Sequence, residues 1–242
     1  MATSPLDQFE IAPILSIQVG GLDLSYTNSA FFMTLAVAGT VALLTLGVRR
    51  RSLVPTRLQS VAEMLYEVVA NMVRDNVGSG GRQYFPFIFS LFMFILFGNL
   101  LGMIPGGFTF TSHIIVTFTL AFFIFVAVTI IGFWKHGLGY FGMFFPHGAP
   151  AWTAIILVPI EVVSYLSRPI SLSVRLFANM TVGHLMLKVI GGFILPMGIV
   201  GGLLPLGGLV AITALEFLIA VIQAYVFTIL TCIYLNDALH MH

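Results

Sequence analysis

The stretch SLSVRLFANMTVGHLMLKV, Ser171–Val189, places one arginine, Arg175, inside an otherwise apolar region of the chain. This stretch belongs to an almost unbroken apolar run over 151–190, and a second long run covers 206–239. At about 1.5 Å per residue, a helix of about 40 residues is about 60 Å long, twice the thickness of a hydrocarbon core of about 30 Å. The two runs therefore predict two long, steeply tilted helices that form a hairpin, with a turn near 198–202.

The composition indicates a membrane protein. Of the 242 residues, 59% are hydrophobic and only 8% are charged, whereas soluble domains carry about 25% charged residues. The net charge of +1 argues against nucleic-acid binding, which needs a basic patch. The single cysteine, Cys232, is expected to be a small buried apolar side chain rather than part of a disulfide or metal site. We expect no metal and no cofactor.

Shorter apolar runs predict three further spans, at 29–48, 84–105 and 113–134. A cationic cluster follows the first span and indicates the inner side of the membrane, which places segment 1–28 outside; its members are Arg49, Arg50, Arg51 and Arg57. Apolar residues at helical spacing over 54–77 predict an amphipathic helix at the inner surface. The expected fold is one all-α polytopic membrane domain over 1–242, with five crossing helices and one amphipathic helix.

Polar residues within the predicted hairpin form a pattern. Ionisable groups at bilayer depth cost about 2.5–3.5 kcal/mol each, so they mark functional sites. In an antiparallel hairpin, three pairs share one register to within two residues: Arg175 with Gln223, His184 with Glu216, and Glu161 with Asp237. This register predicts that the pairs lie at three different depths in the membrane. The first pair lies at mid-depth, the second toward the outer side, and the third near the inner surface with His240 and His242.

The residue types at these levels suggest proton transfer. Histidine and glutamate exchange protons near neutral pH in a suitable environment, whereas arginine stays charged. Titratable groups on both sides of a fixed cation predict two proton half-paths with a barrier between them. Arg175 and His184 are nine residues apart, about half a helical turn in direction. Arg175 is therefore expected to face a partner in the membrane, and His184 to line an access path.

Other interpretations of the same residues stay open. Arg175 and Arg168 could snorkel to the membrane surface, and His184 with Glu216 could be a structural pair. A self-contained secondary transporter or proton channel is the main functional alternative, although such transporters are built from repeated halves and no repeat is visible. A purely structural scaffold is a second alternative, but it would need no inner, middle and outer series of titratable groups.

Three segments carry a resemblance to a known family. RPISLSVRLFANMTVGHL (168–185), LEFLIAVIQAYVFTILTCIYL (215–235) and FGNLLGMIP (97–105) closely resemble subunit a of the F-type ATP synthases. The resemblance covers most of the chain, from about Phe9 to His240. The order of His184 before Glu216 resembles the alphaproteobacterial and mitochondrial forms.

The resemblance implies roles for individual residues. Arg175 matches the essential arginine that faces the carboxylates of the rotating c-ring. The access path from the outer side would comprise His184, Glu216, Asn179 and Gln223. The exit path to the inner side would lie near Glu161, Asp237 and His240.

The resemblance also implies a function and partners. The chain would be a proton-conducting stator subunit that couples proton flow to c-ring rotation and ATP synthesis. It would have no nucleotide site of its own within the multi-subunit enzyme. Its partners would be the c-ring, the peripheral-stalk b subunits, the remaining synthase subunits and the lipid bilayer. Its location would be a bacterial plasma membrane or the mitochondrial inner membrane.

Overall fold

The computed structural model describes residues 9–16, 18–19, 22–23, 25–49, 55–104, 107–144, 153–194 and 196–240. The helices are α1 (Asn28–Val48), α2 (Arg57–Val77), α3 (Phe85–Gly102), α4 (Ile114–His136), α5 (Ala154–Ile194), α6 (Gly198–Gly201) and α7 (Leu203–Leu239), with 3₁₀ helices η2 (Gly78–Tyr84), η3 (Phe110–Ser112) and η4 (Gly137–Phe144). Within these residues, five segments are long and apolar enough to cross a membrane: α1, α4, α7, residues 80–102 and residues 155–194. The all-α polytopic class is confirmed.

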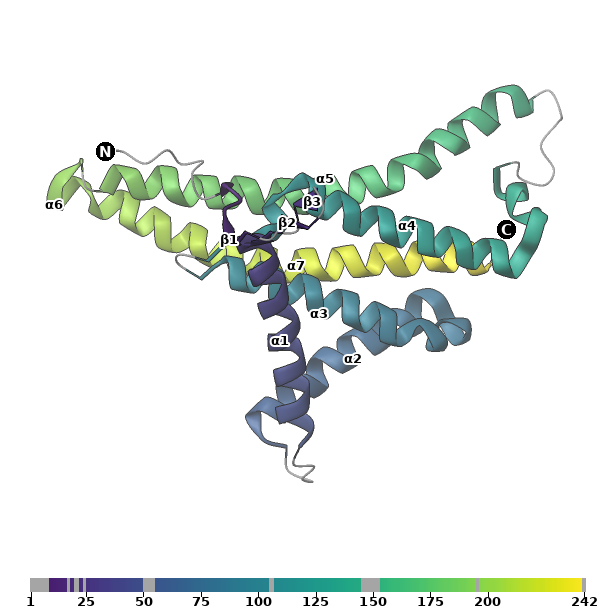
Figure 1. Ribbon diagram of the computed structural model, residues 1–242, viewed down its shortest axis with the longest axis horizontal. Coiled ribbons are helices and arrows are strands. Elements are labelled where there is room, and N and C mark those ends of the chain that lie inside the picture. The colour runs from purple at the N-terminus through teal and green to yellow at the C-terminus, as the bar shows by residue number, and fades with distance from the viewer. Residues whose placement is uncertain are drawn as a thin grey trace.

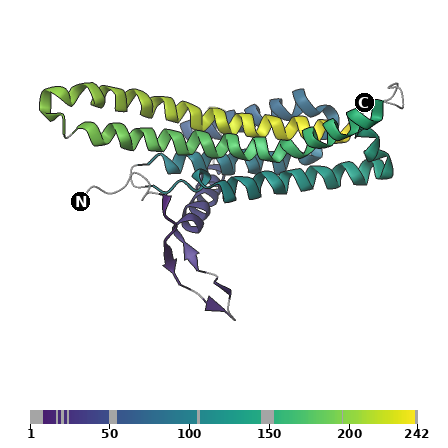
Figure 2. The same ribbon diagram turned by 90° about the horizontal axis from the view of Figure 1, so that it is seen from above.

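The two longest helices lie side by side and form the predicted hairpin (Figures 1 and 2). Helix α5 has 41 residues and α7 has 37, and the short α6 joins them at the turn. Gly198 begins α6 at φ 70°, a conformation that glycine adopts without strain. Helix α1, whose 21 residues match the thickness of one bilayer, runs steeply across the hairpin (Figure 1). The hairpin is therefore tilted strongly relative to α1.

The core lies where α3, α4, α5 and α7 meet. Its central side chains are almost fully buried and come from three of these helices: Ile88 and Met93 in α3, Leu172 and Leu176 in α5, and Phe227 in α7. The outward faces of α1, α4 and α5 expose many large apolar side chains. Such surfaces are expected where the solvent is lipid.

Helix α2 is amphipathic and packs against α1, α3 and α7. It buries Val69, Met72 and Val73, while Glu63 and Glu67 are exposed. The helix begins at Arg57 because the Thr56 side chain accepts a hydrogen bond from the Gln59 amide at 3.4 Å, as an N-cap residue does.

The N-terminal segment contains two pairs of antiparallel strands that the sequence analysis did not predict (Figure 2). Strand β1 (Pro13–Leu15) pairs with β4 (Tyr26–Thr27), and β2 (Gln18–Val19) pairs with β3 (Leu22–Asp23). Thr27 then caps α1, because its hydroxyl accepts a hydrogen bond from the Ala30 amide at 3.3 Å. Arg50, Arg51 and His242 lie outside the described residues, as do Pro105 and positions 151–152 of the expected spans.

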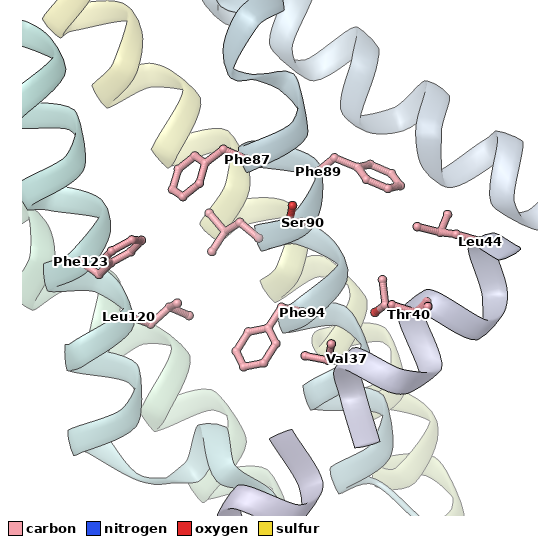
Figure 3. A pocket seen from close by; sticks show the side chains of 11 residues that line it. Val37, Thr40, Leu44, Phe87, Phe89, Ser90, Phe94, Leu120 and Phe123 are labelled. Carbon is pink, nitrogen blue, oxygen red and sulfur yellow. The ribbon is translucent and has the colours of Figure 1, made fainter. Parts of the chain in front are cut away.

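An apolar groove of about 480 Å³ opens between α1, α3 and α4 (Figure 3). Its walls include Phe87, Phe94 and Phe123. The two hydroxyl groups in the lining, those of Thr40 and Ser90, donate to carbonyl oxygens of their own helices. The groove therefore offers no free polar side chain to a migrating ion, and the candidate functional site lies elsewhere.

Candidate functional site

The hairpin brings His184 of α5 and Glu216 of α7 together, as their register predicts. His184 Nδ1 lies 3.7 Å from Glu216 Oε1, and the exposed fractions of the two side chains are 13% and 7%. A glycine on α5 makes room for this approach. A Cβ atom at Gly183 would lie 2.2 Å from Glu216 Oε1, well inside van der Waals contact.

Residues outside the hairpin complete the surroundings of His184. Its Nε2 atom lies 2.8 Å from Thr109 Oγ1 and 3.0 Å from the carbonyl oxygen of Gly102. The Thr181 hydroxyl of α5 donates to the carbonyl oxygen of Ser112 at 3.2 Å. The end of α3 and the segment around η3 thus pack against the His184 end of the polar region.

Asn99 of α3 is a fully buried polar residue that the sequence analysis did not assign to the site. Its amide nitrogen donates to the Ala220 carbonyl oxygen of α7 at 3.2 Å, and its amide oxygen accepts a hydrogen bond from the Thr111 hydroxyl at 2.9 Å. Both ends of the amide are therefore satisfied, which buried polar groups require. In the sequence, the position of this asparagine in the middle of the apolar run 84–105 is the feature that could have identified it as a site residue.

Further along the hairpin, the expected pairing of Arg175 with Gln223 is replaced by a pairing one turn away. Asn179 Nδ2 donates to Gln223 Oε1 at 2.8 Å, and Gln223 is only 3% exposed. Arg175 lies on the exposed face of α5 and forms no hydrogen bond or ion pair with the residues that the structure describes. The register drifts along the hairpin, so Asn179, four residues further along α5 on nearly the same helix face, lies opposite Gln223 in place of Arg175.

Several polar atoms near this level lack a protein partner within the described part of the chain. They are His184 Nδ1, both carboxylate oxygens of Glu216, and Gln223 Nε2. A void too small to hold a water molecule touches His184, Glu216 and Asn179. Unpaired buried polar atoms are rare and costly in native proteins, and here they collect beside one titratable pair. The Glu216 carboxylate therefore has no hydrogen-bond partner among the described residues and lies beside the His184 ring.

At the end of the hairpin away from its turn, the predicted pairing of Glu161 with Asp237 is wrong. Asp237 Oδ2 lies 3.2 Å from Arg168 Nη1, with side-chain exposures of 39% and 26%. Arg168 offers the opposite charge, whereas two carboxylates would repel one another. Glu161 is half-buried and forms no ion pair among the described residues. His240, directly after α7, is exposed, and its Nδ1 atom lies 2.9 Å from Asn236 Oδ1.

Aromatic rings hold the Arg168 side chain from two sides. Its Cζ atom lies 5.3 Å from the ring centroid of Tyr165 and 5.0 Å from that of Tyr234. The Tyr165 hydroxyl lies 2.9 Å from that of Tyr140. Tyr140 belongs to η4, outside the spans, and burial together with this hydrogen bond raises its pKa above the ordinary value of 10.0. The Tyr140 hydroxyl therefore stays a neutral hydrogen-bonding group beside Tyr165.

We expect Arg168→Gln to lower the melting temperature of the complex. The substitution removes a partly exposed ion pair, worth up to about 1 kcal/mol, and two ring contacts worth about 0.5–1 kcal/mol each. Thermal aggregation in detergent would measure the shift. Arg82→Gln is the matched control, because Arg82 is exposed and has no ion-pair partner among the described residues. Equal melting temperatures for the two variants would contradict the stabilising role of Arg168.

Together, these features define a class of protein. It is a polytopic all-α membrane protein with ionisable side chains placed along a long helical hairpin, and with an unpaired arginine on one face. Residues 30–236 match the family described as ATP synthase A chain. The chain belongs to this family, and the resemblance seen in its sequence is confirmed.

Full-length relatives agree with this assignment. The chain is 63% identical over 239 residues to ATP synthase subunit a of Rhodospirillum rubrum, covering 99% of both chains. It is 60% identical over 245 residues to that of Paramagnetospirillum magneticum, covering 99% of both, and 56% identical over 243 residues to that of Pelagibacter ubique, covering 100% of both. It is therefore a multi-pass membrane subunit of a multi-subunit ATP synthase, and these bacterial relatives indicate the plasma membrane.

Proposed function

We propose that this chain is the proton-conducting stator subunit of the synthase membrane sector, and that it provides two offset half-channels facing the c-ring. The observation that carries the proposal is the position of Arg175, exposed on α5 and without an ion-pair partner among the described residues. A charge at bilayer depth needs a counter-charge. A carboxylate on a neighbouring subunit supplies one, and a ring of carboxylates supplies a succession of them.

The proposed outer half-channel ends at His184 and Glu216, with Asn179 and Gln223 beside it. A proton that reaches this pair passes to a c-ring carboxylate. The neutral carboxyl group can then enter lipid, whereas its anion could not. Because Arg175 lies on a different face of α5 from His184, the carboxylate meets the arginine and the proton donor at different positions of the ring.

The proposed inner half-channel receives the proton after rotation. A carboxyl group that arrives at Arg175 from the other direction loses its proton, because the fixed cation stabilises the anion. Glu161, Asp237 and His240 lie toward the inner end of the hairpin and are the candidate acceptors. Asp237 is held beside Arg168, so this path has a charged pair at its inner end.

A self-contained transporter is less well supported. Such a protein would hold the counter-charge of Arg175 within its own chain, and no described carboxylate pairs with Arg175.

We also propose that the partners of this chain include peripheral-stalk b subunits, and that the catalytic nucleotide sites lie only on other subunits. Each proton that crosses through the subunit then releases about 2.3 kcal/mol for every 100 mV of membrane potential.

Exchanging the two outer residues tests whether they form a proton path. Single variants His184→Leu and Glu216→Gln are each expected to reduce ATP-driven pumping in reconstituted vesicles by on the order of a hundredfold, a typical loss for a missing proton-transfer group. The double variant His184→Glu with Glu216→His should pump faster than either single variant, because both groups are still present. A double variant as slow as the singles would contradict a proton path built from this pair.

A further inference from the structure

The contacts of His184 determine which of its two ring nitrogens carries the proton when the ring is neutral. A neutral imidazole has one donor nitrogen and one acceptor nitrogen. The Gly102 carbonyl oxygen lies 3.0 Å from Nε2 and has no proton to donate. This contact is a hydrogen bond only if Nε2 carries the proton; otherwise two lone pairs would face one another.

The other side of the ring agrees with this assignment. Nδ1 lies 3.7 Å from Glu216 Oε1, beyond the range of about 2.7–3.2 Å for an N–H···O bond. A proton on Nδ1 would therefore form only a poor hydrogen bond to Glu216. In that state the lone pair of Nε2 would also repel the carbonyl oxygen of Gly102. With the proton on Nε2, Nδ1 presents its lone pair toward the carboxyl group of Glu216.

Thr109 adds a second partner on the same side of the ring. Its Oγ1 atom lies 2.8 Å from Nε2, and Thr109 is only 4% exposed. The position of Gly102 depends on the absence of a side chain, because a Cβ atom there would lie 2.3 Å from Thr109 Oγ1. Gly102 and Thr109 thus fit together around one ring nitrogen.

We propose that the Gly102 carbonyl and Thr109 are positioning groups that hold the neutral His184 ring with its proton on Nε2, so that Nδ1 is the atom that exchanges protons with Glu216. The inference rests on the proposed function for the exchange itself, whereas the position of the proton can be observed without any transport. In each transfer, the proton leaves the Glu216 carboxyl group and binds the Nδ1 lone pair, which gives an imidazolium that later releases it.

Solid-state NMR of the assembled complex in lipid, with ¹³C- and ¹⁵N-labelled histidine, tests the proposal directly. The chain has 6 histidines, and a difference spectrum against His184→Gln assigns the ring. For the neutral ring, observed at alkaline pH, we expect a protonated Nε2 and an unprotonated Nδ1. A neutral ring protonated on Nδ1 would overturn the proposal.

Variants at Thr109 supply the second readout. Thr109→Val should shift the tautomer ratio toward Nδ1 and slow ATP-driven pumping, each by about two- to tenfold, as expected for one lost hydrogen bond. Thr109→Ser should restore both. Thr119→Val is the matched control, because the Thr119 hydroxyl donates within its own helix to Ile115 at 2.7 Å. Identical behaviour of Thr109→Val and Thr119→Val would also overturn the proposal.

The outcomes separate this inference from the proposed function. A ring protonated on Nδ1, in a complex whose pumping depends on His184 and Glu216, would remove the positioning role alone. A ring protonated on Nε2, in a complex that pumps normally without His184 or Glu216, would instead remove the proton path and with it the exchange step.

Discussion

A complex that carries Arg175→Ala is expected to lose ATP-driven proton pumping and to gain a passive proton leak. Arg175 is the fixed cation on the exposed face of α5, and removing it takes away the attraction for the c-ring anion. If that attraction is comparable to the membrane cost of an ionisable group, about 2.5–3.5 kcal/mol, pumping falls by about a hundredfold or more. A protonated carboxyl group could then pass between the two half-channels without net rotation.

The measurement is proton flux in reconstituted vesicles, first driven by ATP and then by a potential without nucleotide. Arg175→Lys keeps a charge but loses the planar guanidinium group, so it should leak less than Arg175→Ala. Arg82→Ala is the matched control, since this arginine is an exposed residue of η2. Normal pumping and tight vesicles with Arg175→Ala would make the arginine a packing residue and would sink the proposed function.

Gly183→Ala is expected to cause the second large loss, through displacement of the Glu216 side chain. The added Cβ atom would lie 2.2 Å from Oε1 and 2.9 Å from Cδ of Glu216. The colliding atoms belong to the end of the Glu216 side chain, so this side chain moves rather than the backbone, and the gain of up to about 1 kcal/mol from replacing glycine in a helix does not restore its position. Because the carboxylate must move away from His184, pumping should fall by roughly tenfold.

Gly191→Ala is the matched control for this substitution. It lies on the same helix and has open space around its added Cβ atom, so it keeps the gain in helix propensity without the collision. A double variant of Gly183→Ala with Glu216→Asp should recover part of the pumping, because the shorter carboxylate withdraws from the added methyl group. Native activity in Gly183→Ala would show that the spacing of His184 and Glu216 is unimportant.

Much of the candidate site could be predicted because the membrane makes polar residues conspicuous. His184 and Glu216 were paired from their positions in two apolar runs, and the structure brings them within 3.7 Å. Neither Thr109 nor the Gly102 carbonyl could be predicted in the same way. Threonine is common in membrane helices and loops, and a backbone carbonyl leaves no mark in a sequence.

The prediction at the inner end failed for a different reason. A constant register assumes that two helices stay aligned along their whole length, which real helix pairs with a crossing angle do not. Aligned at His184 and Glu216, the register placed Glu161 opposite Asp237, but Arg168 occupies that position in the structure. The same drift places Asn179, rather than Arg175, against Gln223.

The sequence by itself determined the membrane class, the long hairpin and the residues that carry charge inside it, because hydropathy and helical rise depend only on composition and length along the chain. Only the tertiary structure decided which of these residues meet. Contacts between α5, α7 and the end of α3 depend on the rotation, offset and crossing of helices distant in sequence. Those three quantities are set by packing of the whole bundle, and they leave Arg175 turned outward while His184 and Glu216 face each other.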